Sequence, residues 1–168
     1  MITVRDFEHR DVAPANALTN FHIQHTTAHF GLEPAADADF EHAWRKGSDT
    51  HPWLVAELDG QFAGYAKAGV WRERGAYRNT CETGIYVERH AQGRGVGRAM
   101  YQHLLSRLAS EGYHAVVAGM SLPNPGSVAL HESVGFRHVG IFREVGDKHG
   151  ARRDIGFWQI NLDEPTRA

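Results

Sequence analysis

The sequence predicts an α/β fold in which a mixed sheet is flanked by helices. Strand-like and helix-like segments alternate along the 168 residues without internal repeats, which is typical of this class. The 42% hydrophobic content is sufficient for a packed core, and no linker rich in Pro, Gly or Ser divides the chain. We therefore expect residues 1–168 to form a single domain.

The first half of the chain contains a short alternating strand, two helices and a hairpin. We expect them at 2–5, 11–28, 37–45, and 53–58 with 62–66. Asp59-Gly60 separates the two hairpin strands, and this dipeptide supplies the positive φ angles of a tight turn. The hairpin is the clearest local prediction in this half.

The second half begins with a strand at 80–87, followed by a helix with Val96, Met100, Leu104 and Leu108 on one face and Gly112 at its end. The remaining elements are expected at 115–120, 127–134, 137–145 and 155–162. Pro125 suits a first helical turn, and Asn124 can cap it.

A glycine-rich loop, Gln92-Gly93-Arg94-Gly95-Val96-Gly97, connects the 80–87 strand to the following helix. Its glycines allow tight turns that direct several N–H groups at one point, and the helix N-terminus adds its positive dipole end. The loop therefore predicts an anion site suited to a pyrophosphate.

Two families with similar loops are disfavoured. A Walker loop ends in Gly-Lys-Ser/Thr, whereas Gly97 is followed by Arg98-Ala99. A dinucleotide fold places its glycines after the first strand, with an acidic residue about 20 residues later, whereas this loop lies in mid-chain and Glu111 belongs to the helix end. The remaining pattern, Gln-x-x-Gly-x-Gly after Ile-Tyr-Val, resembles the acetyl-CoA loop of the GNAT superfamily of N-acetyltransferases.

The resemblance becomes narrower over the rest of the chain. The segments at 52–57, 82–87, 130–132, 148–150 and 154–159 are similar to phosphinothricin and methionine sulfoximine N-acetyltransferases. This resemblance implies a mostly antiparallel twisted sheet with acetyl-CoA in a cleft between central strands. It also implies a small amino-acid-like amine as acceptor and a homodimer.

We expect the cofactor to follow the strand edge, the glycine loop and the next helix. The pyrophosphate would lie on the 93–97 amides and the pantetheine along the backbone of 85–87, and the resemblance assigns amide and phosphate contacts to Asn124 and Ser127. The expected set is Ile85, Tyr86, Val87, Gln92, Gly93, Arg94, Gly95, Val96, Gly97, Arg98, Asn124 and Ser127. For the helix expected at 127–134, the alternative to a cofactor-binding role is a capped surface helix with a polar outer face.

Glu82 is the candidate general base. Acyl transfer to an amine needs the amine uncharged, and Gly84 leaves space on the same strand face as Glu82. The alternative is a solvated carboxylate or an ion pair with an upstream arginine. Cys81 should face away from Glu82, so we expect direct attack by the amine without a covalent enzyme intermediate.

His131 shares a helical face with Asn124 and Ser127, at i+7 and i+4. In the resembling subfamily a histidine stands at this position, which makes His131 a candidate for proton handling. The alternative is that it only binds the cofactor or fills the cleft.

The acceptor is expected near an arginine-rich loop at 71–78. Arginine forks bind carboxylate and phosphinate oxygens in pairs. By resemblance, Arg72, Arg74 and Tyr77 lie near the acceptor and Phe30 forms an apolar wall, although Arg72 replaces a lysine familiar in one branch of the family. The alternative is a solvated charged loop.

His22, His25 and His29 share a helical face, but no Cys or carboxylate cluster completes a metal site nearby, so they are expected to line the acceptor cleft and no metal is expected. A formal charge of −2 does not favour nucleic acid or anionic membranes as partners. One cysteine and no apolar leader predict a cytoplasmic protein. Two alternatives stay open: acetylation of protein, peptide or other amines, and a non-catalytic acyl-CoA sensor.

Overall fold

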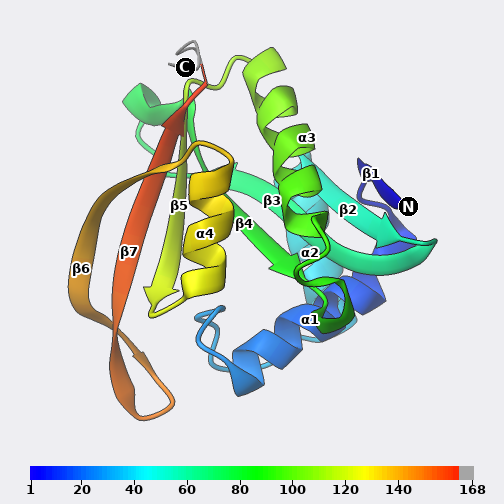
Figure 1. The fold of residues 1–168 in the computed structure, drawn as a ribbon, viewed down its shortest axis with the longest axis horizontal. Coiled ribbons are helices and arrows are strands. Elements are labelled where there is room, and N and C mark those ends of the chain that lie inside the picture. Colours follow the sequence, from blue (N-terminus) through cyan, green and yellow to red (C-terminus); the bar gives the residue numbers. More distant parts are fainter. Residues whose placement is uncertain (163–168) are drawn as a thin grey trace.

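The computed structural model of the protein describes residues 1–162 and contains one seven-stranded sheet with helices on both faces (Figure 1). Its elements are β1 (Ile2–Asp6), α1 (Val12–His25), α2 (Asp37–Ser48), β2 (Trp53–Leu58), β3 (Gln61–Val70), β4 (Thr80–Val87), α3 (Val96–Ser110), β5 (Ala115–Leu122), α4 (Pro125–Ser133), β6 (Arg137–Lys148) and β7 (Ala151–Asn161). The strand order is β1-β2-β3-β4-β5-β7-β6, and only β4 and β5 are parallel neighbours. The predicted mixed, mostly antiparallel sheet is confirmed.

The two faces of the sheet bury different cores. Helices α3 and α4 cover one face, where Met100, Leu104 and Leu108 of α3 are fully buried. The other face packs against α1 and α2 and is rich in aromatic side chains, among them Trp53 and Tyr65. Among the described residues, no helix has the length and apolar character needed to span a bilayer. Alternate residues of each strand therefore belong to different cores.

The Asp59-Gly60 hairpin is confirmed by its backbone. Both residues have positive φ, 53° and 81°, which is the combination required by a type I′ turn. The turn sets the register in which β2 pairs with β3, with Trp53 opposite Lys67.

Several boundaries differ from the sequence prediction, and α2, β3 and β5 each extend further than expected. Helix α1 ends at His25 instead of residue 28, because the backbone of Thr26 is extended. The Thr26 N–H and hydroxyl both donate to the His22 carbonyl and so cap this end of the helix. Helix α4 begins two residues early, at Pro125, since Asn124 Oδ1 accepts the Ser127 N–H at 3.1 Å. Strands β6 and β7 are longer than predicted and close into a hairpin through His149 and Gly150.

Gly64 in β3 is required by a close approach between strands. Its φ is +150°, and a Cβ there would overlap the Tyr86 carbonyl oxygen and lie 3.0 Å from Val87 Cα. The residue follows a register shift in the β2/β3 pairing. Gly64 thus holds β3 against the C-terminal end of β4.

We predict that Gly64→Ala lowers the free energy of unfolding by at least about 2 kcal/mol, through backbone strain and overlap with β4. Gly69→Ala in the same strand is the control, because a Cβ at Gly69 meets nothing within 4 Å. That change should stay below about 1 kcal/mol. Urea unfolding of both variants measures the difference, and equal stabilities would contradict the close approach.

Candidate active site

The site originates where β4 and β5 stop pairing. Their parallel ladder contains only Thr80–Ala115, Cys81–Val116 and Glu82–Val117. Beyond Glu82, β4 still pairs with β3 as far as Val87, and β5 still pairs with β7 as far as Leu122. The facing edges of β4 and β5 therefore separate and leave backbone N–H and C=O groups without a strand partner.

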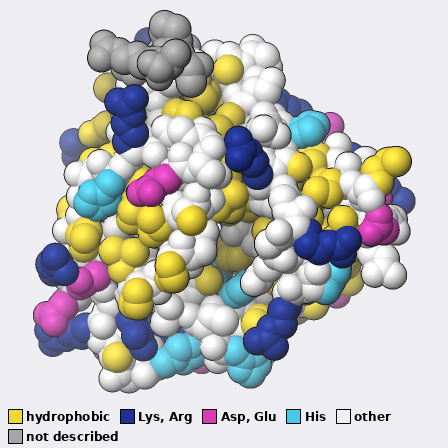
Figure 2. Space-filling model, in the orientation of Figure 1, with side chains coloured by type: hydrophobic (Ala, Val, Ile, Leu, Met, Phe, Trp, Pro, Cys, Tyr) yellow, Lys and Arg dark blue, Asp and Glu magenta, His cyan; other side chains and the backbone are white. Residues whose placement is uncertain are grey.

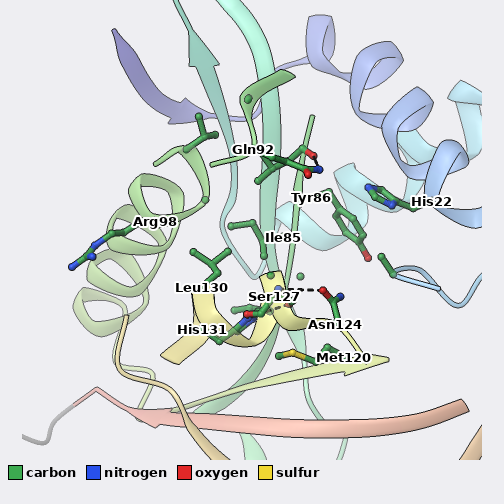
Figure 3. A pocket seen from close by; sticks show the side chains of 18 of the residues that line it. His22, Ile85, Tyr86, Gln92, Arg98, Met120, Asn124, Ser127, Leu130 and His131 are labelled. Carbon is green, nitrogen blue, oxygen red and sulfur yellow. Dashed lines mark hydrogen bonds between the residues drawn. The ribbon is translucent and has the colours of Figure 1, made fainter. Parts of the chain in front are cut away.

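A cleft of about 600 Å³ lies at this separation. Figure 2 shows a hollow near the middle of this face of the molecule, with Lys, Arg and His side chains around it. The cleft brings together twelve of the predicted site residues: Ile85, Tyr86, Val87, Gln92, Gly93, Gly95, Val96, Gly97, Arg98, Asn124, Ser127 and His131 (Figure 3). It does not include Glu82, Arg94 or the four predicted acceptor residues.

The glycine loop has the backbone expected of an anion cradle. Gly93 and Gly95 have φ of +72° and +85°, and α3 begins directly after Gly95. Gly97 has a different role, because a Cβ there would lie 2.9 Å from Leu130 Cδ2, where α3 packs on α4. The loop thus combines two turns with a helix N-terminus that opens into the cleft.

The polar side chains of the loop lie in three different settings. The Gln92 amide donates to the Val87 carbonyl at 3.1 Å and so ties the loop to the end of β4. Arg94 pairs with Asp59 at 3.5 Å on the exposed surface. The Arg98 side chain points away from the cleft (Figure 3).

Helix α4 places Asn124, Ser127 and His131 toward the cleft, as their spacing predicted. His131 is only 4% exposed, so the alternative of a polar outer face is wrong for this residue. Its Nδ1 donates to the Ser127 carbonyl at 2.7 Å, which leaves Nε2 to accept the Tyr101 hydroxyl at 2.6 Å. Burial lowers the pKa of His131 and outweighs the opposing effect of the Ser127 hydrogen bond, so the net shift favours a neutral ring.

Glu82 lies on the opposite sheet face, beside the cleft floor. Its Oε1 is 3.5 Å from the Cβ position of Gly119, a glycine that lines the cleft. Burial raises the pKa of Glu82, and the positive charge of Lys67 partly offsets this. Such a carboxylate is a stronger base than one in water.

Cys81 faces the other core, as predicted. It is fully buried in the cluster beneath α3, and burial raises the pKa of its thiol to about 12. The thiolate is therefore scarce at neutral pH, and the side chain does not reach the Glu82 face.

His22 and His29 lie together at the α1 side of the cleft. Their rings lie 5.6 and 5.9 Å from the Tyr86 ring, and the Lys148 ammonium donates to both of their carbonyls. Burial, with nearby Lys67 and Lys148, lowers the pKa of His29 to about 4. His22 lines the cleft, whereas His25 instead packs against Phe21. Within residues 1–162, no three His, Cys, Asp or Glu side chains are grouped to hold a metal.

The predicted acceptor residues lie outside the main cleft. Arg72, Arg74 and Tyr77 line a separate hollow of about 450 Å³ together with Glu73. The neighbouring Trp71 packs edge-on against Phe157 at 5.8 Å, which connects this loop to β7. Phe30 packs instead at Gly146, within the β6–β7 hairpin.

Sequence reasoning missed three polar residues near the cleft. Ser121 lines it with a buried hydroxyl that has no hydrogen-bond partner in the described part of the chain. Tyr101 connects His131 to Thr83. Lys67 of β3 lies on the same sheet face as Glu82. A signal was present in the sequence, because Lys67 is a charged residue on the same strand face as Tyr65 and Gly69 in a central strand.

The sequence matches known acetyltransferases over nearly its full length. It is 38% identical to the phosphinothricin N-acetyltransferase of Streptomyces viridochromogenes, over 98% of this chain and 90% of that protein. It is 34% identical to the L-methionine sulfoximine/L-methionine sulfone acetyltransferase of Salmonella typhimurium, over 97% and 96%.

The structure agrees with a solved relative. A phosphinothricin acetyltransferase from Sinorhizobium meliloti, in complex with acetyl-CoA, has a TM-score of 0.93 at 30% identity, with 99% of this chain and 91% of that chain covered. Residues 17–136 match the acetyltransferase (GNAT) family. The chain therefore belongs to the GNAT family, as an acetyl-CoA-dependent N-acetyltransferase.

Proposed function

We propose that this enzyme transfers acetyl from acetyl-CoA to the amino group of a small amino-acid-like acceptor, such as phosphinothricin or methionine sulfoximine. The observation that carries the proposal is the cleft between β4 and β5, which joins the glycine loop to the sheet face of Glu82. The names of the two relatives support this acceptor class.

The cleft residues suit the parts of acetyl-CoA in order. The pyrophosphate would lie on the amides of 93–97, beside Arg94 and Arg98, and the pantetheine along the open edge of Ile85–Val87. Since Asn124 uses Oδ1 for its cap, its amide N–H₂ is available to donate to the cofactor, as is the Ser127 hydroxyl. A backbone N–H of Tyr86 or Val87 would polarise the thioester carbonyl.

The chemical step follows from the placement of Glu82. Glu82 removes a proton from the acceptor ammonium, directly or through water, and the amine nitrogen attacks the thioester carbonyl carbon. A C–N bond forms, the C–S bond breaks, and the second nitrogen proton passes to the leaving sulfur, so that CoA leaves as the thiol. The buried thiol of Cys81 supports direct attack because it is on the other sheet face.

His131 is proposed as the second proton-handling residue. His131 lines the cleft, and its Nε2 is hydrogen-bonded to the hydroxyl of Tyr101, which is fully buried behind it. A neutral imidazole at the cleft wall can relay the second nitrogen proton to the leaving sulfur.

The acceptor side chain is proposed to meet Arg72, Arg74, Tyr77 and Phe30. The hollow of the arginine loop offers guanidinium groups to a second anionic group, such as a phosphinate. We also propose a cytoplasmic homodimer. Exposed Val139, Phe142 and Val145 on the edge strand β6 support such an interface.

Gly95→Asp tests the anion cradle. The aspartate would set a negative charge against the pyrophosphate, so acetyl-CoA affinity measured by calorimetry should fall at least about a hundredfold. Gly112→Asp is a matched control, because Gly112 has φ of +86° at the far end of α3. Unchanged affinity in a folded Gly95→Asp protein would exclude the cradle.

Glu82→Gln tests the base. Turnover should fall roughly a hundredfold or more while acetyl-CoA binding persists. Since the pKa of Glu82 is raised, the parent should lose activity as pH falls through that value, and the variant should lack this loss. The deficit should shrink at high pH, where the amine is already neutral. Rates within twofold of the parent across pH would make Glu82 structural.

An acceptor screen decides between the function classes. With acetyl-CoA as donor, phosphinothricin, methionine sulfoximine or methionine sulfone should be acetylated far faster than polyamines or N-terminal peptides. Preference for peptides would favour the protein-acetyltransferase alternative. Binding of acetyl-CoA without turnover on any amine would indicate a sensor.

A further inference from the structure

On the sheet face that carries Glu82, charged residues and glycines alternate along β3 and β4. In the β3/β4 register, Lys67 is opposite Gly84 and Gly69 is opposite Glu82. Two opposite charges therefore occupy one diagonal of a square, and glycines occupy the other. Residues on such a diagonal are about 7–8 Å apart, which is within reach of long side chains.

The space between the two charges is open. A Cβ at Gly69 would meet nothing within 4 Å, and one at Gly84 would meet only Tyr86 Cε2 at 3.6 Å and the Lys67 stem at 3.9 Å. Gly84 and the neighbouring Gly119 of β5 both line the main cleft, and Glu82 Oε1 is 3.5 Å from the Cβ position of Gly119. The floor between Lys67 and Glu82 is thus continuous with the cleft.

The Lys67 ammonium has a cation–π contact but no anionic partner among the described residues. It lies 4.7 Å from the centre of the Trp53 ring and forms no hydrogen bond or ion pair within residues 1–162. The chain has two other lysines: Lys148 donates to the carbonyls of His22 and His29, and Lys46 is exposed on α2. Lys67 is therefore the described lysine that is both partly buried and free to bind an anion.

The Lys67 ammonium is close enough to influence titratable groups on both sides of this space. Burial lowers the pKa of Lys67, and the negative charge of Glu82 opposes that shift. Lys67 in turn contributes to the lowered pKa of His29, whose ring lies beside Tyr86. The ammonium thus acts on both sides of the acceptor end of the cleft.

We propose that Glu82 and Lys67 form the two ends of a zwitterion site, in which Glu82 receives the acceptor amine and Lys67 binds the α-carboxylate. This inference rests on the proposed function and deepens it by naming the group that the acceptor must carry. An α-amino acid carries both groups on one carbon, and the Gly69 and Gly84 floor leaves room for that carbon between the two side chains.

The site selects free amino acids over other amines. A carboxylate would form charge-assisted hydrogen bonds with Lys67, whereas a peptide N-terminus or an α-carboxamide presents a neutral amide and leaves the ammonium unpaired. A polyamine would place a second positive charge near the Lys67 ammonium, which would repel it. Lys67 is therefore a specificity-determining residue for the backbone of the acceptor, and the arginine loop is left to contact its side chain.

The test compares methionine sulfone with its α-carboxamide. These acceptors differ in the carboxylate charge and in the amine pKa, and the second difference is the same for the parent and every variant. The parent should prefer the acid in kcat/KM by about tenfold or more. Lys67→Met keeps the apolar stem against Trp53 and should remove this preference, mainly through a higher KM for the acid. Lys46→Met should keep it, and Lys67→Arg should retain part of it.

Loss of the Lys67 charge also raises the pKa of Glu82, but Glu82 is the base for both acceptors, so this change does not account for a loss of acid preference. Unchanged acid preference in a folded Lys67→Met protein that binds acetyl-CoA normally would overturn the Lys67 assignment and leave the proposed function intact. A parent that acetylates peptides or polyamines but no free amino acid would overturn both.

Discussion

The separation of β4 from β5 is the constraint on which the rest of the structure depends. A strand edge in the interior of a sheet cannot leave its N–H and C=O groups unpaired without a large cost. Pairing ends at Glu82–Val117, while β3 and β7 continue to hold the outer edges of the two strands. The inner edges therefore form a slot that a long ligand with amide groups can fill by extending the ladder.

The two sheet faces beside the slot carry different kinds of residues. On the α3 face, Thr83, Tyr101 and His131 form a buried hydrogen-bonded chain that holds α3, α4 and β4 together. On the α1 face, Glu82 and Lys67 lie beside the aromatic core that contains Trp53 and Tyr65. The carbonyls of His22 and His29 bind Lys148, so the β6–β7 hairpin fixes the segment that borders this end of the cleft.

Local chemistry explains what the sequence could predict. Asp59-Gly60 and the glycines of the 93–97 loop favour positive φ angles by their residue type alone. The hairpin and the anion cradle could therefore be predicted without knowing which residues pack against them. The role proposed for Lys67 depends on which residues of β4 lie opposite it. The sequence of β3 alone does not determine how β3 pairs with β4, so this role could not be predicted. The arginine loop was recognisable as a cluster, but its place outside the main cleft depends on how Trp71 packs against Phe157.

Amide hydrogen exchange with and without acetyl-CoA tests the central claim most directly, because it reports on the open edge of β4 itself. Residues 84–87 contain amides that face the slot instead of β3, and these should become strongly protected when acetyl-CoA binds, together with the amides of 93–97. The amides of β6, which lies at the sheet edge away from the slot, should not change. Bound acetyl-CoA with unchanged exchange along β4 would contradict the account.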